Sequence, residues 1–160
     1  MYKYPLIIAL SILVSTSVLA QETPPPMKIK KVMKTTEQWK KTLSAEAFYI
    51  LREKGTDQPG EGGYTAHFEK GTYHCTGCKL QLFESDRKFR AHCGWPSFDE
   101  AIPGTVLYVP DHSHGMIRTE IICAACEGHL GHVFDDGPIE TTGKRYCVNS
   151  TSITLIPEKE

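Results

Sequence analysis

The first regular pattern of apolar and polar residues in the chain is helical. Thr35 and Gln38 have the spacing of a capping box, which predicts a short helix that ends near Thr42. Ser44 is suited to cap a second helix, because apolar residues recur after it at helical spacing, and Gly55 is placed to end that helix. Two short helices are therefore predicted near the start of the folded part.

Beyond residue 70 the pattern changes to short runs of β-type residues between turn residues. No helical pattern separates these runs, so parallel β-α-β units are not expected and antiparallel sheets fit better. Phe83 and Tyr108 are expected in the core. The sequence thus predicts a mainly β fold with a small helical layer. The predicted strands are residues 71–75, 80–84, 105–109, 116–123, 132–134 and 146–155.

The first 20 residues have the pattern of a secretory signal peptide. Lys3 supplies a positive charge, residues 6–18 are uncharged and mostly apolar, and Ala20 ends a suitable cleavage sequence before Gln21. The apolar stretch is shorter than the roughly 20 residues of a comfortable membrane span, but an uncleaved anchor is the alternative. We expect a secreted, periplasmic protein. This divides the chain into a signal peptide (1–20), a linker with a Pro triplet (21–33) and one domain (34–160).

The charge of the chain argues against several classes of partner. Without the predicted signal peptide it carries 17 basic and 19 acidic residues, so it has no evident electrostatic footprint for nucleic acid or an anionic membrane. All six cysteines lie in the predicted domain. In an exported protein an even number of cysteines raises the possibility of a disulfide framework.

Four of the cysteines form two pairs with a metal-binding spacing. Cys75 and Cys78 make one C-x-x-C unit, and Cys123 and Cys126 make another. Two such turns complete a tetrahedral thiolate set that suits one structural Zn²⁺, although the 44 residues between them exceed the usual spacing of a compact zinc ribbon. Paired disulfides are the main alternative. Thioredoxin-like redox motifs fit less well, because neither pair lies at a strand-to-helix turn.

Cys147 lies in a run, RYCVNS, that reads as a strand. The two-residue period puts Arg145, Cys147 and Asn149 on one face, with Tyr146 and Val148 toward the core. A guanidinium beside a thiol favours the nucleophilic thiolate, and an amide two residues away could bind a polar substrate group. This arrangement is typical of a reactive cysteine.

Cys93 is followed by Gly94 and Pro96, which disfavour regular secondary structure, so we expect Cys93 on a loop. Trp95 offers a flat apolar surface suited to a methyl group or thioether. The residues alone leave two interpretations open: a redox pair of Cys93 with Cys147, or a structural disulfide between them beside a core tryptophan.

Two histidine pairs complete the candidates for chemistry. His129 and His132 lie three residues apart beside Gly131, and a role in proton transfer is a better functional interpretation than metal binding. His112 and His114 resemble a metal pair, but we expect them on a solvated turn.

Several segments together resemble one known family, the peptide-methionine (R)-S-oxide reductases, or methionine sulfoxide reductases of type B. The resemblance covers about residues 35–155. One departure is a loop between Asp136 and Cys147 that is one residue longer than usual, with Lys144 where Leu is common. The matching segments are 37–41 (EQWKK), 52–56 (REKGT), 93–98 (CGWPSF), 118–126 (RTEIICAAC), 129–138 (HLGHVFDDGP) and 145–150 (RYCVNS).

The resemblance implies two antiparallel sheets that close into a barrel-like shape, and one structural zinc ion on the four paired cysteines. It implies that Cys147 attacks the sulfoxide of oxidised protein methionine, that Cys93 resolves the resulting sulfenic acid as a disulfide, and that a thioredoxin-like donor reduces the disulfide. His132 would be the proton donor, and a monomer is expected. The implied substrate-binding residues are Trp95, His129, Asn149 and Arg145.

A different class remains open: a zinc-stapled binding module without chemistry, in which Cys93 and Cys147 form a structural disulfide. A thiol–disulfide oxidoreductase that uses the C-x-x-C pairs is a third possibility.

Overall fold

The computed structural model describes residues 28–60 and 63–159. The predicted signal peptide and the first part of the predicted linker lie outside these residues. The end of that linker packs on the domain: Ile29 and Val32 contact the core, and the Val32 N–H donates to the Ala125 carbonyl at 2.8 Å. In the described part of the chain, no helix is long and apolar enough to cross a membrane.

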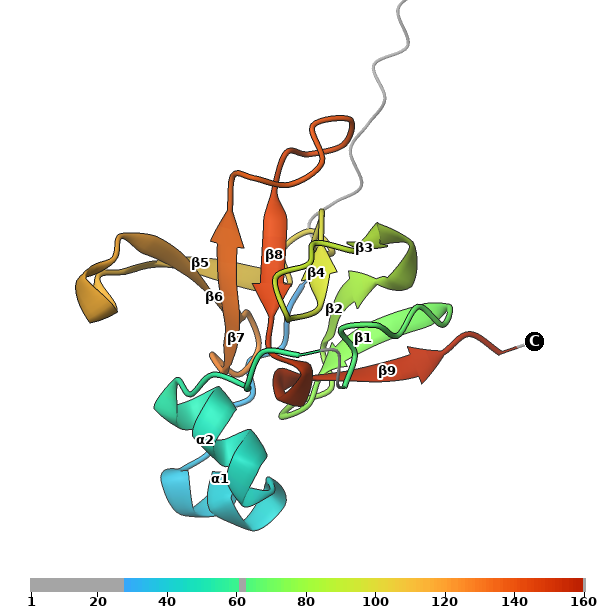
Figure 1. Cartoon of the computed structure of the whole chain (residues 1–160). Coiled ribbons are helices and arrows are strands. Elements are labelled where there is room, and N and C mark those ends of the chain that lie inside the picture. Colours follow the sequence, from blue (N-terminus) through green and yellow to red (C-terminus); the bar gives the residue numbers. More distant parts are fainter. Residues whose placement is uncertain (1–27, 61–62, 160) are drawn as a thin grey trace, which may run out of the picture.

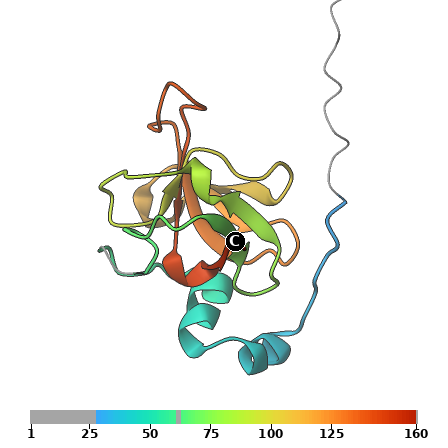
Figure 2. The ribbon, with the colours of Figure 1, turned by 90° about the vertical axis from the view of Figure 1, so that its right-hand side faces the viewer.

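The two predicted helices are present, α1 at Thr36–Thr42 and α2 at Ala45–Glu53, and both lie at one end of the molecule (Figures 1 and 2). Thr35 and Gln38 form the predicted capping box, and Ser44 caps α2. The expected end of α2 is corrected by one residue. Lys54, with φ 58°, takes the left-handed position, and Gly55 follows it where a Cβ would lie 2.2 Å from the Tyr49 ring, so a larger residue would have to displace that ring.

The strands form two antiparallel sheets, as predicted, and the described residues do not close into a barrel (Figure 1). The smaller sheet has the order β2-β1-β9, and the larger has the order β3-β4-β8-β7-β6-β5. The strands are β1 (Gly71–Cys75), β2 (Gln81–Glu84), β3 (Lys88–Phe89), β4 (Ser97–Phe98), β5 (Val106–Asp111), β6 (Arg118–Cys123), β7 (His129–Phe134), β8 (Arg145–Val148) and β9 (Ile153–Pro157). Three short 3-10 turns are η1 (Ser85–Arg87), η2 (Ser113–Gly115) and η3 (Ser150–Ser152).

The long run predicted as one strand at residues 146–155 is two strands in different sheets. The chain leaves the larger sheet at Asn149, makes the turn η3 and enters the smaller sheet at Ile153. The Ser152 hydroxyl donates to the carbonyls of Asn149 and Leu130, at 2.9 and 3.1 Å, which satisfies these buried groups at the crossing.

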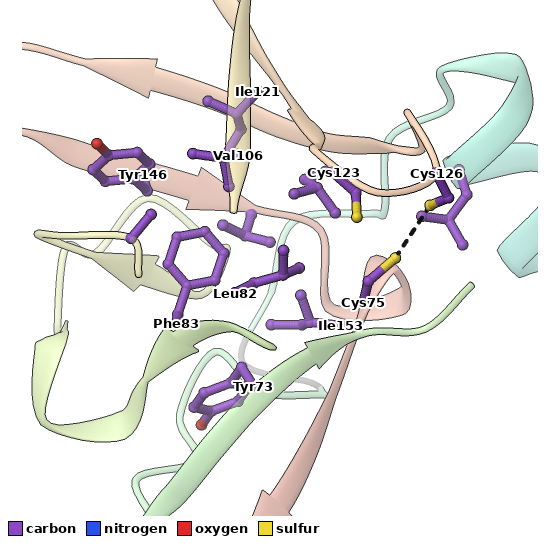
Figure 3. Close-up of a cluster of buried hydrophobic side chains, with 14 of the residues drawn as sticks. Tyr73, Cys75, Leu82, Phe83, Val106, Ile121, Cys123, Cys126, Tyr146 and Ile153 are labelled. Carbon is purple, nitrogen blue, oxygen red and sulfur yellow. Dashed lines mark hydrogen bonds between the residues drawn. The ribbon is translucent and has the colours of Figure 1, made fainter. Parts of the chain in front are cut away.

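The core lies between the two sheets (Figure 3). Phe83 of β2 stacks on Phe98 of β4 at 4.5 Å between ring centroids, and Tyr73 of β1 meets Phe98 edge-on at 5.0 Å. Phe83 is buried as expected, but Tyr108 is 54% exposed. Strand β5 is an edge strand, and the Tyr108 hydroxyl reaches only the Tyr146 hydroxyl, at 2.8 Å.

Candidate active site and metal centre

Four adjacent strands of the larger sheet each contribute one polar residue, and the four residues form a row across the sheet. Cys147 of β8 lies between Ser97 of β4 and His132 of β7, and His132 lies opposite Glu120 of β6. Directly opposite residues of antiparallel strands share a face, so the register itself brings thiol, imidazole and carboxylate together. The cavity on this face is lined by Thr56, Trp95, Arg118, Gly131, His132, Phe134, Cys147, Val148 and Asn149.

The two cysteines outside the zinc-type pairs meet at the edge of this cavity. Cys93 lies on the predicted loop, and its Sγ is 3.8 Å from the Cys147 Sγ and 3.4 Å from the Ser97 Oγ. Both side chains are partly buried, and on β8 Tyr146 and Val148 face the core as predicted. Residues 54 positions apart in sequence are thus within hydrogen-bond reach.

The ionisation of the pair differs from the prediction. Burial, followed by the charge and hydrogen bond of Cys93, raises the pKa of the Cys147 thiol to about 12, and Arg145 opposes this only in part. Burial also raises the pKa of Cys93, but hydrogen bonds with Ser97 and with the Trp95 backbone outweigh it, and the net pKa is lowered. In the resting pair Cys93 therefore loses its proton first, and Cys147 keeps one.

Asp57 holds two predicted pocket residues in place. Its carbonyl accepts from the Trp95 indole N–H at 3.0 Å, and its N–H donates to the Asn149 Oδ1 at 2.9 Å. The Asp57 carboxylate is in turn fixed by the Thr151 N–H at 2.9 Å. Asn149 also donates to the Leu130 carbonyl at 3.2 Å, which leaves one amide hydrogen unused.

His132 forms a hydrogen bond with a residue that sequence reasoning missed. Its Nε2 lies 2.8 Å from the Asp111 Oδ2, and the Arg118 guanidinium donates to the same oxygen at 2.7 Å. Hydrogen bonds from Ser113, then from His132 and Arg118, hold the pKa of Asp111 well below its usual range.

His129 and Arg145 lie behind the cavity lining and do not form part of it. His129 is buried, with its Nδ1 2.8 Å from the Glu120 Oε1. Arg145 donates twice to the Asp136 carboxylate, at 2.8 Å each, and lies over the Phe134 ring.

The missed residues share one feature: their partners are remote in sequence. In the sequence, Asp111 is the first residue of a turn. The exposed histidines of this turn, His112 and His114, resemble a metal-binding pair, which gives no indication of a role for Asp111. The hairpin register, in which Asp111 pairs with Arg118, was the one signal that could have singled it out. Asp57 acts mainly through its backbone, which leaves no mark in the sequence.

The four paired cysteines converge on one centre, as predicted, and the two turns have the same hydrogen bonds. The Cys75 N–H donates to the Leu80 carbonyl at 2.8 Å, and the Cys123 N–H donates to the Gly128 carbonyl at 2.9 Å. The residue after each second cysteine is left-handed, with φ 65° at Lys79 and 59° at Glu127.

The sulfur geometry of this centre fits a tetrahedral metal ion. The four Sγ atoms lie within 4.8 Å of one another, with 3.7 Å between Cys75 and Cys126 (Figure 3) and 3.5 Å between Cys78 and Cys123. A zinc ion with Zn–S bonds of about 2.3 Å requires tetrahedral S···S edges of about 3.8 Å. The arrangement of the four sulfurs is therefore consistent with a zinc site.

These features define a class of protein: a mainly β protein with two neighbouring cysteines beside a cavity and a separate four-cysteine centre. Comparison with known proteins specifies it further. The SelR domain model matches residues 43–157. The chain is 50% identical over 133 residues to a probable methionine-R-sulfoxide reductase B of Caenorhabditis elegans, covering 81% of this chain and 88% of that protein.

Two further relatives point to the same family. A peptide methionine sulfoxide reductase MsrB of Bradyrhizobium diazoefficiens is 53% identical over 129 residues, which are 80% of this chain and 92% of that protein. The peptide methionine sulfoxide reductase B5 of Arabidopsis thaliana is 51% identical over 129 residues, 80% of this chain and 91% of that protein. The chain belongs to the SelR domain family, with the type B methionine sulfoxide reductases, as the sequence motifs indicated.

Proposed function

We propose that this chain reduces methionine-R-sulfoxide in proteins and peptides to methionine, with Cys147 as the nucleophile. The observation that carries the proposal is the 3.8 Å approach of the Cys93 and Cys147 sulfurs beside a cavity that also holds Trp95 and His132. The names of the relatives supply the substrate class.

The cavity offers complementary groups to a methyl sulfoxide. Trp95 and Phe134 present apolar surface to the methyl group and the methionine side chain. The unused amide hydrogen of Asn149 is available to the sulfoxide oxygen, and the His132 imidazolium, held by Asp111, protonates that oxygen. A protonated oxygen makes the sulfur a better electrophile.

In the first half of the cycle the Cys147 sulfur attacks the sulfoxide sulfur. The Cys147 proton passes to the Cys93 thiolate across the 3.8 Å contact, which removes the difficulty of ionising a buried thiol on its own. The attack forms a bond between the two sulfurs. The protonated oxygen then transfers from the substrate sulfur to the Cys147 sulfur while the new sulfur–sulfur bond breaks, so methionine leaves and Cys147 becomes a sulfenic acid. Methionine sulfoxide is thereby reduced by two electrons and Cys147 is oxidised by two.

In the second half of the cycle the Cys93 thiol condenses with the sulfenic acid, which gives a disulfide and one molecule of water. A dithiol donor of the thioredoxin type then attacks the Cys93 sulfur, releases Cys147, and leaves as a disulfide. Cys93 suits this attack because its loop borders a second surface cleft, which shares only Trp95 with the lining of the substrate cavity. That cleft is lined by Gly60, Thr65, Ala66, Phe89, Arg90, Ala91, His92, Gly94 and Trp95.

We also propose that the four-cysteine centre holds one Zn²⁺ with a structural role. All four ligands come from the protein, so the ion would have no open position for substrate. Cys75 and Cys78 flank the end of β1, and Cys123 and Cys126 flank the β6–β7 turn, so the metal would join the smaller sheet to the larger one.

Export remains a proposal from the sequence pattern of residues 1–20. We propose that the signal peptide is removed after Ala20 and that the enzyme works in the periplasm, where a thioredoxin-like donor must reach it. Intact mass of the protein from a cell-envelope fraction tests this: an N-terminus at Gln21 supports it, and a retained Met1 contradicts it.

A pair of cysteine variants tests the enzymatic proposal. Cys147→Ser should abolish the reduction of methionine-R-sulfoxide, because no other thiol lines the cavity. Cys93→Ser should still give one turnover but lose recycling by thioredoxin. An epimer-resolved assay measures both. Multiple turnover of Cys93→Ser with thioredoxin would refute the resolving role, and activity of Cys147→Ser would refute the nucleophile.

A further inference from the structure

A buried carboxylate next to the candidate site has no part in the chemistry proposed so far. Glu120 is 2% exposed, and its two oxygens have different partners. Oε1 bonds to the His129 Nδ1 at 2.8 Å, and Oε2 accepts from the Lys54 ammonium at 2.7 Å. The chain Lys54–Glu120–His129 therefore links the end of α2, through β6, to β7.

The backbone at Lys54 gives an independent reason to assign this lysine a role. Its φ of 58° is a left-handed conformation that glycine adopts without strain and that residues with a Cβ adopt rarely. A glycine at this position would satisfy the backbone of the helix end. What lysine adds is the amine that reaches Glu120.

The charged groups around His129 and His132 determine how the Lys54 amine can influence the protonation of the two histidines. The His129 and His132 rings lie 5.6 Å apart between centroids, so a proton on one opposes a proton on the other. Around His132 lie Asp111 of β5, Arg118 of β6 and Cys147 of β8, and Arg145 of β8 lies opposite Phe134, two residues along β7. His129 is faced by Glu120, with Lys54 behind it.

We propose that the Lys54–Glu120 ion pair is a positioning device that keeps His129 as the neutral Nδ1–H tautomer, so that His132 alone carries the proton of the histidine pair. The proposal rests on the proposed function in assigning the proton-donor role to His132. A buried carboxylate needs a compensating charge. While Lys54 supplies this charge to Glu120, His129 can stay neutral and needs only to donate one hydrogen bond to the carboxylate. Without Lys54, His129 must take up a proton and would then suppress the protonation of His132.

Lys54→Gly separates this role from a structural one, because it removes the amine and also relieves the backbone strain. In the full-length ¹⁵N-labelled protein, NMR of the imidazole nitrogens should show His129 as neutral Nδ1–H near pH 7. In Lys54→Gly we expect the His129 titration to rise by about one pH unit and that of His132 to fall. Lys54→Arg should restore the original spectra.

The control is Lys31→Met, which removes a surface lysine paired with Glu127 at 3.3 Å and away from the histidines. It should leave both titrations unchanged. Unchanged histidine titrations in Lys54→Gly, or a protonated His129 near pH 7 in the parent protein, would overturn the proposal. The spectra need no turnover, so they decide this point even if the chain proved inactive on methionine sulfoxide.

Discussion

At the scale of single residues, Cys93 and Cys147 differ because their surroundings differ. Cys93 lies on a loop and forms hydrogen bonds with Ser97 and Trp95, whereas Cys147 lies on a central strand of the larger sheet, where burial has the larger effect on its thiol. The reactivity of the pair stays a prediction from the sequence, and the nearby Arg145 suggested a thiolate at Cys147, whereas burial raises the pKa of this thiol. The guanidinium is occupied by Asp136, so burial prevails.

This difference predicts the pH dependence of alkylation. Because the pKa of Cys147 is raised to about 12, its reaction with iodoacetamide should be slow at pH 7 and rise about tenfold per pH unit up to that value. Cys93, with a lowered pKa, should react first and reach its plateau earlier. Peptide mapping of alkylated protein measures both rates.

Cys93→Ser tests whether Cys93 is a cause of the raised pKa of Cys147. It removes the thiolate that raises the pKa of Cys147, so alkylation of Cys147 at pH 8 should become faster than in the parent. Faster alkylation of Cys147 than of Cys93 at pH 7 in the parent protein would contradict this account of the pair.

At the scale of elements, local signals predicted most of the helices and strands. The residues that cap α1 and α2 form hydrogen bonds with residues fewer than four positions away, so the starts of both helices could be located from the sequence. The two-residue strands β3 and β4 were missed, because so short a strand is defined only by its partner across the sheet. The division of the last predicted strand was missed for a similar reason: only the packed fold shows that Ile153 pairs with β1.

The packing of β7 against β8 behind the nucleophile gives an element-scale prediction. Gly131 has φ 151°, and a Cβ there would lie 2.1 Å from the Cys147 carbonyl oxygen. Gly131→Ala should therefore separate the two strands, lower the free energy of unfolding by roughly 2–3 kcal/mol and displace Cys147. Urea unfolding measures the loss of stability.

Gly104→Ala is the matched control. Gly104 also has a positive φ, of 80°, but a Cβ there would meet no atom within 4 Å. It should cost only the backbone strain, about 1 kcal/mol. Equal losses in the two variants would show that the close approach to Cys147 has no special importance.

At the scale of the whole molecule, the C-x-x-C spacing predicted the four-cysteine centre, whereas the charged residues around the histidines could not be predicted. In a C-x-x-C unit the positions of the two thiols follow from the local turn. Because a tetrahedral zinc ion needs four ligands, two such units were expected to converge. Asp111 and Glu120 become neighbours of His132 and His129 only when the β5–β6 and β6–β7 registers are known.

The proposed role of the metal predicts a link between zinc content and stability. Cys123→Ser should lose the ion, expected at one per chain, and become sensitive to proteolysis, because the energy of a closed metal site is part of the folding energy. Cys93→Ser should retain zinc and protease resistance. Metal analysis by mass spectrometry with limited proteolysis measures both, and an unchanged zinc content in Cys123→Ser would refute the assignment.

The most direct test of the central claim is a count of thiols after reaction with one equivalent of methionine-R-sulfoxide and no reductant. We expect two thiols to disappear for each methionine formed, and peptide mapping to find them as a Cys93–Cys147 disulfide while the cysteines of the four-cysteine centre stay unmodified. If methionine forms without loss of these two thiols, or if no thiol is consumed at all, the redox role of the pair is contradicted.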